Sequence, residues 1–551
     1  GTSQLNNRTW HLVLTPGIPD PRNPTGRYTQ QQLSGNLPVR FNRSGFGGGE
    51  RGSKLSSAEQ GEQPAYTRTE RESPIDVKGK LSQGIGAIPD TVKNWVFNTF
   101  ILLFYNQILG IDAFSVSVVL AIAIFFDAVT DPIVASISDN LSSRWGRRHP
   151  LMIIASLPLG VGLFAIFVPP DGFSDYQLLG WLLTFVIMTR GFMTLYFVPW
   201  AAIASELSDD YHERTSIMSY RYAAGWTVAV LFPVFTYNFL IVGTEAYPIG
   251  QLNPAGYPAM ALCAALLLSG GALATSLLTL KQVPYLRQHK SPQRFSLRGI
   301  VAELLRALQN RQFALIFTIM ILVSALGGTT VNIGIYMTTF FWGLNSEDLR
   351  WFALSAVGAV AAFPLVAGVQ RRWDKKRILL VCAYVSLIDG MMIVLLRFAD
   401  VLPQNGEPML LAILVGAGVF AAGVAVIQGI ISSSILADVL DDHELRTGWR
   451  QEGMFNAAIS FSGKAVSSMG IVMGGLIITA IDFPTNVAPA DVPHVTITRL
   501  GLVVGVVIPL LYLIPISLIH RYKITRVMHA DIQRQLMEKR RAQVRQSDAP
   551  R

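Results

Sequence analysis

Residues 114–137 read FSVSVVLAIAIFFDAVTDPIVASI, and this stretch carries both the main fold signal and the main chemical signal of the chain. A bilayer core about 30 Å thick is crossed by roughly 20 mostly apolar residues in an α-helix. The stretch meets that length, yet it contains two aspartates, Asp127 and Asp131. Ionisable side chains at membrane depth are costly enough to be functional candidates by default.

The composition of the whole chain is typical of a membrane protein. Of its 551 residues, 51% are hydrophobic and 15% are charged, whereas a soluble domain carries about 25% charged residues. The net charge of +9 comes from Lys and Arg residues that fall between apolar stretches instead of forming one basic face. This pattern favours the lipid bilayer as a partner and excludes nucleic acid. The two cysteines, Cys263 and Cys382, lie in apolar runs and predict neither a disulfide framework nor a metal site.

Apolar runs of membrane-spanning length recur about twelve times, which predicts an all-α polytopic membrane protein with twelve transmembrane helices. Only helices or closed barrels satisfy the backbone in lipid, and these runs are too long for barrel strands. The predicted helices are 88–109, 114–137, 150–168, 177–205, 217–243, 257–281, 312–342, 349–370, 377–398, 408–437, 454–481 and 499–520.

Lys and Arg residues are concentrated in alternate loops. The loop after the second helix carries Arg144, Arg147 and Arg148, and the loop after the eighth carries five basic residues within 371–377. The odd-numbered loops are nearly free of them. The positive-inside rule then predicts that the even-numbered loops and both termini are cytoplasmic. We expect a multi-pass protein of the plasma membrane, which is the inner membrane in a bacterium.

The longest internal connection divides the chain into two six-helix halves. SRWGRRHPL at 143–151 resembles RRWDKKRIL at 371–379, and DDYHERT at 209–215 resembles DDHELRT at 441–447. Because both pairs occupy equivalent loops, they indicate a duplication and the major facilitator fold, whose halves rock around a substrate site near the bilayer midplane. The predicted divisions are a disordered polar tail at 1–80, an N-terminal half at 81–281, a basic cytoplasmic linker at 282–311, a C-terminal half at 312–520 and a basic cytoplasmic tail at 521–551.

Asp127 and Asp131 stand four residues apart and therefore share one helical face. Two like charges on one face favour a bound cation or a shared proton, and hard cations prefer carboxylate and hydroxyl oxygens. Thr130 adds one hydroxyl group. Asp127 and Asp131 are thus the predicted ligands of sodium, if the ion is not a proton. The alternative is that Asp131 caps the helix near Pro132 or pairs with an arginine.

Polar residues on other predicted helices are candidate substrate ligands. Lys464 belongs to a polar stripe in the helix 454–481, where it either binds substrate or neutralises one of the aspartates. Arg190 and Thr194 stand one turn apart, and Arg190 either meets a ligand or pairs with an aspartate. Further stripes suit a polyol or a similar polar ligand, although hydrogen bonding between helices is the alternative for each residue; they contain Thr91, Asn94 and Asn98, and Asn332 and Tyr336.

Taken together, these stretches resemble the glycoside–pentoside–hexuronide cation symporters of the major facilitator superfamily. The resemblance spans roughly residues 81–520, and the aspartate pair with its following Arg-Trp-Gly loop is its most specific part. The stretches that carry it are GIGA at 84–87, DAVTDPI at 127–133, SRWGR at 143–147, VPW at 198–200, ERT at 213–215 with Tyr220 and Arg221, and Lys464.

The resemblance implies a cation site and a substrate site. In that family the two aspartates, the polar residue before the second and a threonine of the fourth helix bind sodium, lithium or a proton, and here these are Asp127, Asp131, Thr130 and Thr194. Sugar-binding members carry acidic residues where this chain has Thr91 and Phe197, which is a departure from the family pattern. From the polar stripes and the resemblance together, the predicted substrate ligands are Thr91, Asn94, Asn98, Arg190, Phe197, Trp200, Arg221, Asn332, Tyr336 and Lys464.

The sequence therefore predicts a monomeric secondary transporter that couples sodium or protons to the symport of a small organic solute, a sugar or glycoside. No enzyme is expected, since no nucleophile with a base and no nucleotide-binding loop is evident, and no cofactor is expected beyond the coupling cation. Two alternatives stay open. One is a sodium-coupled carrier of an amphipathic or lysolipid-like substrate, and the other is a transporter-like sensor that binds ligand without net flux.

Overall fold

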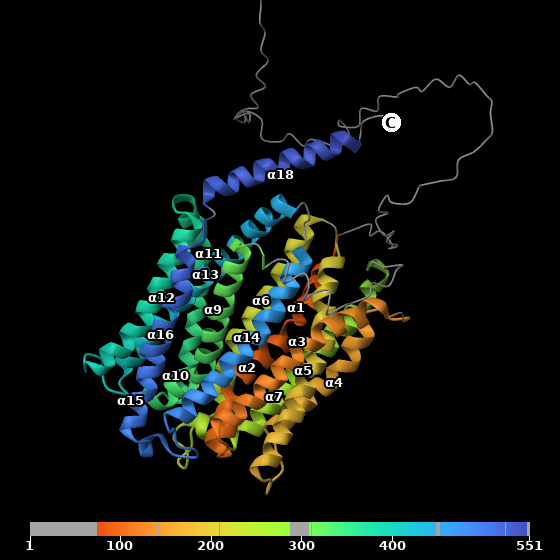
Figure 1. Ribbon diagram of the computed structural model, residues 1–551. Helices are drawn as coiled ribbons and strands as arrows, with labels where there is room; N and C mark the ends of the chain where they lie inside the picture. The colour runs from red at the N-terminus through yellow and green to blue at the C-terminus, as the bar shows by residue number, and fades with distance from the viewer. Residues whose placement is uncertain are drawn as a thin grey trace, which may run out of the picture. The chain divides into compact units, whose positions relative to one another are not determined.

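The computed structural model describes residues 74–141, 143–208, 210–286, 308–309, 311–447, 452–523 and 525–547. Every regular element in these ranges is a helix (Figure 1). Most of the predicted tail at 1–80 and most of the predicted linker at 282–311 fall outside the described residues.

The first half of the chain begins with a short helix, α1 (Val77–Ile85), four residues before the predicted boundary at 81. The side chain of Asp76 accepts a hydrogen bond from the Gly79 amide at 2.9 Å, which caps the helix and sets its start. The remaining elements of this half are α2 (Ile88–Leu103), η1 (Phe104–Ile108), α3 (Ala113–Asn140), α4 (His149–Ile166), α5 (Asp175–Glu206), α6 (Tyr211–Phe235), η2 (Thr236–Leu240), η3 (Gly250–Leu252), α7 (Gly256–Leu278) and η4 (Leu280–Tyr285).

The second half repeats the arrangement with more interruptions. Its elements are α9 (Arg311–Tyr336), η5 (Met337–Phe341), α10 (Ser346–Leu349), η6 (Arg350–Leu354), α11 (Ser355–Arg372), α12 (Lys375–Phe398), α13 (Pro408–Thr447), α14 (Glu452–Ala480), η7 (Pro489–Asp491), α15 (His494–Leu502), η8 (Val503–Val507), α16 (Ile508–Leu511) and α17 (Leu513–His520), followed by α18 (Arg526–Ser547).

Each of the twelve predicted spans coincides with one helix or a run of adjoining helical segments. Among the described residues, ten of these are long and apolar enough to cross a membrane. The other two are α2 with η1, and α14. The predicted fold class, a twelve-helix major facilitator fold, is confirmed.

The two halves end their first spans in the same way. η1 and η5 are both π-helical turns, in which the amides of Leu109 and Trp342 bond to carbonyls five residues earlier, at Phe104 and Met337. The next residues, Gly110 and Gly343, have φ angles of 80° and 63°. Glycine adopts this left-handed backbone without steric cost. The shared geometry supports a duplication.

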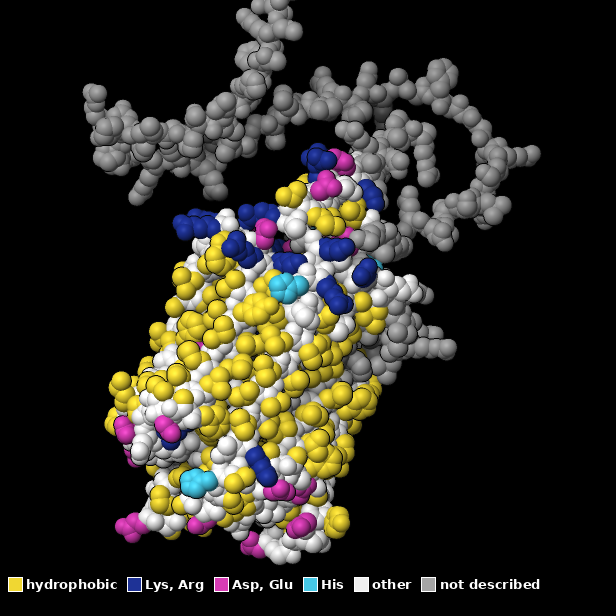
Figure 2. All heavy atoms as spheres, turned by 60° about the vertical axis from the view of Figure 1, so that its left-hand side comes forward, with side chains coloured by type: hydrophobic (Ala, Val, Ile, Leu, Met, Phe, Trp, Pro, Cys, Tyr) yellow, Lys and Arg dark blue, Asp and Glu magenta, His cyan; other side chains and the backbone are white. Residues whose placement is uncertain are grey.

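Apolar side chains cover the middle of the molecule, and charges gather at its two ends (Figure 2). Lys and Arg side chains cluster at one end, here called the basic end, which contains the 143–148 and 371–377 loops. The opposite end, here called the acidic end, carries mainly Asp and Glu. The apolar band between them is the surface that a bilayer would cover.

The halves meet along two helix pairs, since α3 packs against α14 and α2 packs against α9. Hydrogen bonds join them at the acidic end. The Tyr336 hydroxyl donates to Asn106 Oδ1 at 2.7 Å, and the Gln251 amide nitrogen donates to the carbonyl oxygen of Leu344 at 2.8 Å. This end of the bundle is therefore closed by side chains from both halves.

The predicted C-terminal tail contains α18, which runs across the basic end of the bundle (Figure 1). Ile532 and Leu536 are buried, and His529 Nε2 lies 3.2 Å from Asp441 Oδ2 of α13. The basic tail thus packs on the C-terminal half through an apolar stripe and a polar contact.

Candidate functional site

Two helices bring four polar side chains together inside the apolar body. Asp127 and Asp131 stand one turn apart on α3, and Arg190 and Thr194 stand one turn apart on the neighbouring helix α5. Arg190 Nη1 lies 3.2 Å from Asp127 Oδ2. Thr194 Oγ1 lies 2.7 Å from Asp127 Oδ1 and 2.9 Å from Asp131 Oδ1. We call these four residues the carboxylate cluster.

The position of Thr194 constrains the protonation of this cluster. A threonine hydroxyl carries one proton and can donate it to only one of the two carboxylate oxygens. The second short contact therefore has the hydroxyl proton shared between the two carboxylates or a proton supplied by a carboxyl group. In either case, Thr194 joins the two carboxylates of α3 to α5.

Arg190 was predicted either to meet a ligand or to pair with an aspartate, and the structure shows a pair with an aspartate. Its guanidinium pairs with Asp127, and it lies 5.5 Å from the centre of the Phe97 ring on α2. Thr130, a predicted cation ligand, donates its hydroxyl to the Asp127 carbonyl oxygen at 3.2 Å, within its own helix. Lys464 lies on α14, which packs against α3, and its side chain is outside the described residues.

A second site lies on the side of α5 toward α2 and α6. Four predicted substrate ligands, Thr91, Phe197, Trp200 and Arg221, line one cavity of about 470 Å³, here called the aromatic cavity. The Arg221 guanidinium carbon lies 3.4 Å from the Trp200 ring centre, and its Nη1 donates to the Ala201 carbonyl oxygen at 3.4 Å. An arginine stacked on an indole offers a flat, charged platform for a polar ligand.

Two aromatic residues of this cavity were missed by the sequence reasoning. Tyr222 and Trp226 of α6 line it, and 69% and 46% of their surfaces are exposed. The signal was present, because aromatic residues four positions apart share one helical face. They make the cavity more apolar than the predicted polyol site.

The other predicted substrate ligands lie elsewhere. Asn98 lines a separate cavity of about 380 Å³ between the halves, and Asn94 is exposed on the same helix. Asn332 donates to the Gly328 carbonyl oxygen at 2.8 Å, within α9. Tyr336 is fully buried in the contact with Asn106 that closes the acidic end. The structure thus does not bring these four residues into the aromatic cavity.

One helix connects the cluster and the cavity. Arg190 and Thr194 lie on α5, and Phe197 and Trp200 follow within the next two turns. Because an α-helix rises 1.5 Å per residue, about 9 Å of helix axis separates Thr194 from the position of Trp200. A displacement of α5 at one site therefore moves side chains at the other.

With this geometry in view, comparison with known proteins identifies the family. Residues 82–526 match the family model described as MFS/sugar transport protein. The chain belongs to this family. Membership confirms the predicted resemblance to the glycoside–pentoside–hexuronide symporters and the prediction of a transporter instead of an enzyme.

Individual relatives are distant. The chain is 26% identical to an uncharacterized symporter of Synechocystis, over 83% of this chain and 96% of that protein. It is 24% identical to the isoprimeverose transporter of Lactiplantibacillus pentosus, over 71% and 77%. It is 30% identical to the sodium-dependent lysophosphatidylcholine symporter 1 of Xenopus tropicalis, over 32% of this chain and 33% of that protein.

Solved structures agree on the fold. A peptide transporter matches with a TM-score of 0.55 at 11% identity, covering 81% of this chain and 95% of that one. At this identity the likeness supports the major facilitator architecture alone.

The ion pair in the cluster predicts how Asp127→Asn affects folding. This change leaves the Arg190 guanidinium buried without its carboxylate partner, which costs about 3–5 kcal/mol when one member of a buried pair is removed. We expect a lower melting temperature for the purified protein. The double variant Asp127→Asn, Arg190→Gln removes both charges and should recover part of the loss. Equal melting temperatures for the single variant and the wild type would contradict the pairing.

Proposed function

We propose that the protein is a cation-coupled symporter that moves a small organic solute, a sugar or glycoside, by alternating access. The observation that carries this proposal is the Thr194 hydroxyl held between two carboxylates inside the membrane-spanning body. Burying carboxylates in a membrane-spanning body costs free energy, so these aspartates are expected to have a function beyond helix packing. Its symporter relatives support the same function.

The proposed coupling runs through α5. A cation or proton that enters the carboxylate cluster lowers its negative charge and draws Thr194 and the two carboxylates together. Because Trp200 and Arg221 are stacked, the same movement of α5 reshapes the aromatic cavity. Bound cation and bound solute would then favour the same state of the halves, which is the requirement for symport.

A sugar fits the cavity through two features. Aromatic faces pack against the apolar face of a sugar ring, and the Arg221 guanidinium offers hydrogen-bond donors to its hydroxyl groups. The relative that transports isoprimeverose supports this substrate class. Sodium and protons are both compatible with a carboxylate and hydroxyl site.

A second candidate substrate is an amphipathic molecule. Phe197, Tyr222 and Trp226 give the cavity aromatic surface beside the charged Asp90 and Arg221, and a phenylalanine stands where sugar-binding relatives are expected to carry an acid. The lysophosphatidylcholine symporter relative supports this alternative over the part of the chain that it matches.

The proposed orientation places the basic end in the cytoplasm of a plasma membrane, with both termini on that side and the protein acting as a monomer. The closed acidic end then faces outward, and the aromatic cavity is reached from the cytoplasm.

Coupling can be tested by Asp131→Asn in proteoliposomes. We expect uptake driven by a sodium or pH gradient to fall to the level of empty liposomes, while solute exchange without a gradient persists. Asp389→Asn is a matched control, because Asp389 lies at membrane depth on α12 outside the cluster. Full concentrative uptake by Asp131→Asn would refute the coupling site. Solute binding by the wild type without any accumulation would instead indicate a sensor.

Substrate chemistry can be tested by competition. If the cavity favours apolar groups, aryl glycosides should compete better than free sugars. Phe197→Ala should then lower the affinity for aryl glycosides about tenfold, as expected for the loss of one buried aromatic contact. Phe192→Ala on the same helix is the control. Tight binding of an unmodified disaccharide that is lost on Thr91→Val would favour an ordinary glycoside site.

Orientation can be tested by cysteine labelling in a background without Cys263 and Cys382. An impermeant thiol reagent applied outside should label Asp171→Cys at the acidic end and spare Arg371→Cys at the basic end. The reverse pattern would overturn the proposed orientation.

A further inference from the structure

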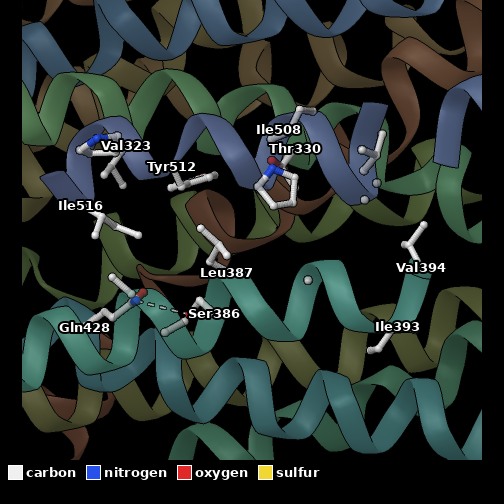
Figure 3. A pocket seen from close by; sticks show the side chains of 18 of the residues that line it. Val323, Thr330, Ser386, Leu387, Ile393, Val394, Gln428, Ile508, Tyr512 and Ile516 are labelled. Atoms are coloured by element: carbon white, nitrogen blue, oxygen red, sulfur yellow. Dashed lines mark hydrogen bonds between the residues drawn. The ribbon is translucent and has the colours of Figure 1, made fainter. Parts of the chain in front are cut away.

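The C-terminal half contains a cavity of about 690 Å³ that the proposed transport cycle does not use. Its walls are α9, α12, α13 and the segments from η8 to α17 (Figure 3). All of these elements belong to one half, so the cavity is distinct from the aromatic cavity on α2, α5 and α6.

The lining of the cavity is long. It runs from Leu379 to Val394 on α12 and from Val504 to Ile519 on the last span. The α12 stretch covers 15 residue steps, or about 22 Å at 1.5 Å per residue. A mainly apolar lining of this length suits a hydrocarbon chain better than a compact polar solute.

An irregular last span explains why the space is open. Pro509 and Pro515 interrupt the helix, which follows a π-helical turn and breaks again at Tyr512. In the first half the equivalent helices α4 and α7 pack closely, since a Cβ at Gly160 would lie 2.6 Å from the Ala265 carbonyl oxygen. The cavity is therefore a feature of the second half and not of the shared fold.

The lining is mainly apolar, and its few polar side chains are Thr330, Ser386, Gln428, Ser432 and Tyr512. Gln428 donates to Ser386 Oγ at 3.3 Å, and Thr330 donates to the Leu326 carbonyl oxygen at 3.0 Å (Figure 3). Gln428, Ser386 and Thr330 thus have protein partners, so an apolar chain can pass them.

We propose that this cavity binds one hydrocarbon chain of a bilayer lipid. Two of its walls, α12 and the last span, also present exposed apolar side chains such as Ile388, Met392 and Leu511. The bilayer is thus the nearest source of hydrocarbon. A chain seated there packs behind α9 and α13 and supports them against the rest of the half.

Glycines in the lining allow a direct test. An added Cβ at Gly429 would meet nothing within 4 Å, so Gly429→Leu can project into the cavity. Gly416 on the same helix is equally open but does not line the cavity, and Gly416→Leu is the matched control. Gly390→Leu is a second filling variant, because the nearest atom to its Cβ is Pro509 Cγ at 3.9 Å.

The full-length protein is reconstituted with phosphatidylcholine that bears a diazirine on one acyl chain, and adducts are mapped after illumination. We expect adducts on the cavity lining. Gly429→Leu or Gly390→Leu should reduce their yield about tenfold, because a leucine side chain that displaces about two methylenes of the lipid chain weakens its binding by about that factor. Gly416→Leu should leave them unchanged.

Melting temperatures give a second readout. Added phosphatidylcholine should stabilise delipidated wild type and Gly416→Leu more than either filling variant. Adducts spread evenly over all bilayer-facing helices, or unchanged in both filling variants, would overturn the proposal. Labelling by a single-chain lysophosphatidylcholine probe alone would also overturn it, since a bilayer lipid would then not be the occupant.

Discussion

The constraint on which the structure depends is the cost of placing charge inside an apolar body. Asp127, Asp131 and Arg190 are tolerated because α3 and α5 face them toward one another, with Thr194 between the carboxylates. A one-residue rotation of either helix would separate these groups and leave charges buried without partners. The cluster therefore fixes the register of α3 against α5, and the packing of α4 and α7 outside them follows.

The cost of buried charge also relates the carboxylate cluster to the proposed movement of α5. In the proposed cycle, a charge that enters or leaves the cluster changes the balance of charge between α3 and α5. Phe197 and Trp200 lie on the same helix as Thr194, so a movement of that helix would carry them with it. Because contacts such as Tyr336 with Asn106 close the acidic end, the proposed movement would open the opposite end.

The sequence was sufficient for those features that depend on local pattern. Apolar length identified the twelve spans, and the i, i+4 spacing of Asp127 and Asp131 identified the cluster. It could not assign Arg190 to Asp127, because that depends on the rotation of α5 about its axis. Tyr336 also shows this limit: its stripe suggested a ligand role, whereas packing places it between the halves.

The two halves differ in how their outer helices pack. In the first half, Gly160 allows α4 to approach α7 closely. In the second half, the last span approaches α12 closely at Gly505, where a Cβ would lie 2.5 Å from Val394, and its prolines and broken helix accompany the long cavity behind α9. If the first half binds the coupling ion and the packing of the second is completed by hydrocarbon, as proposed, the two halves respond differently to the bilayer. Their relative movement would then depend on lipid composition as well as on the bound cation.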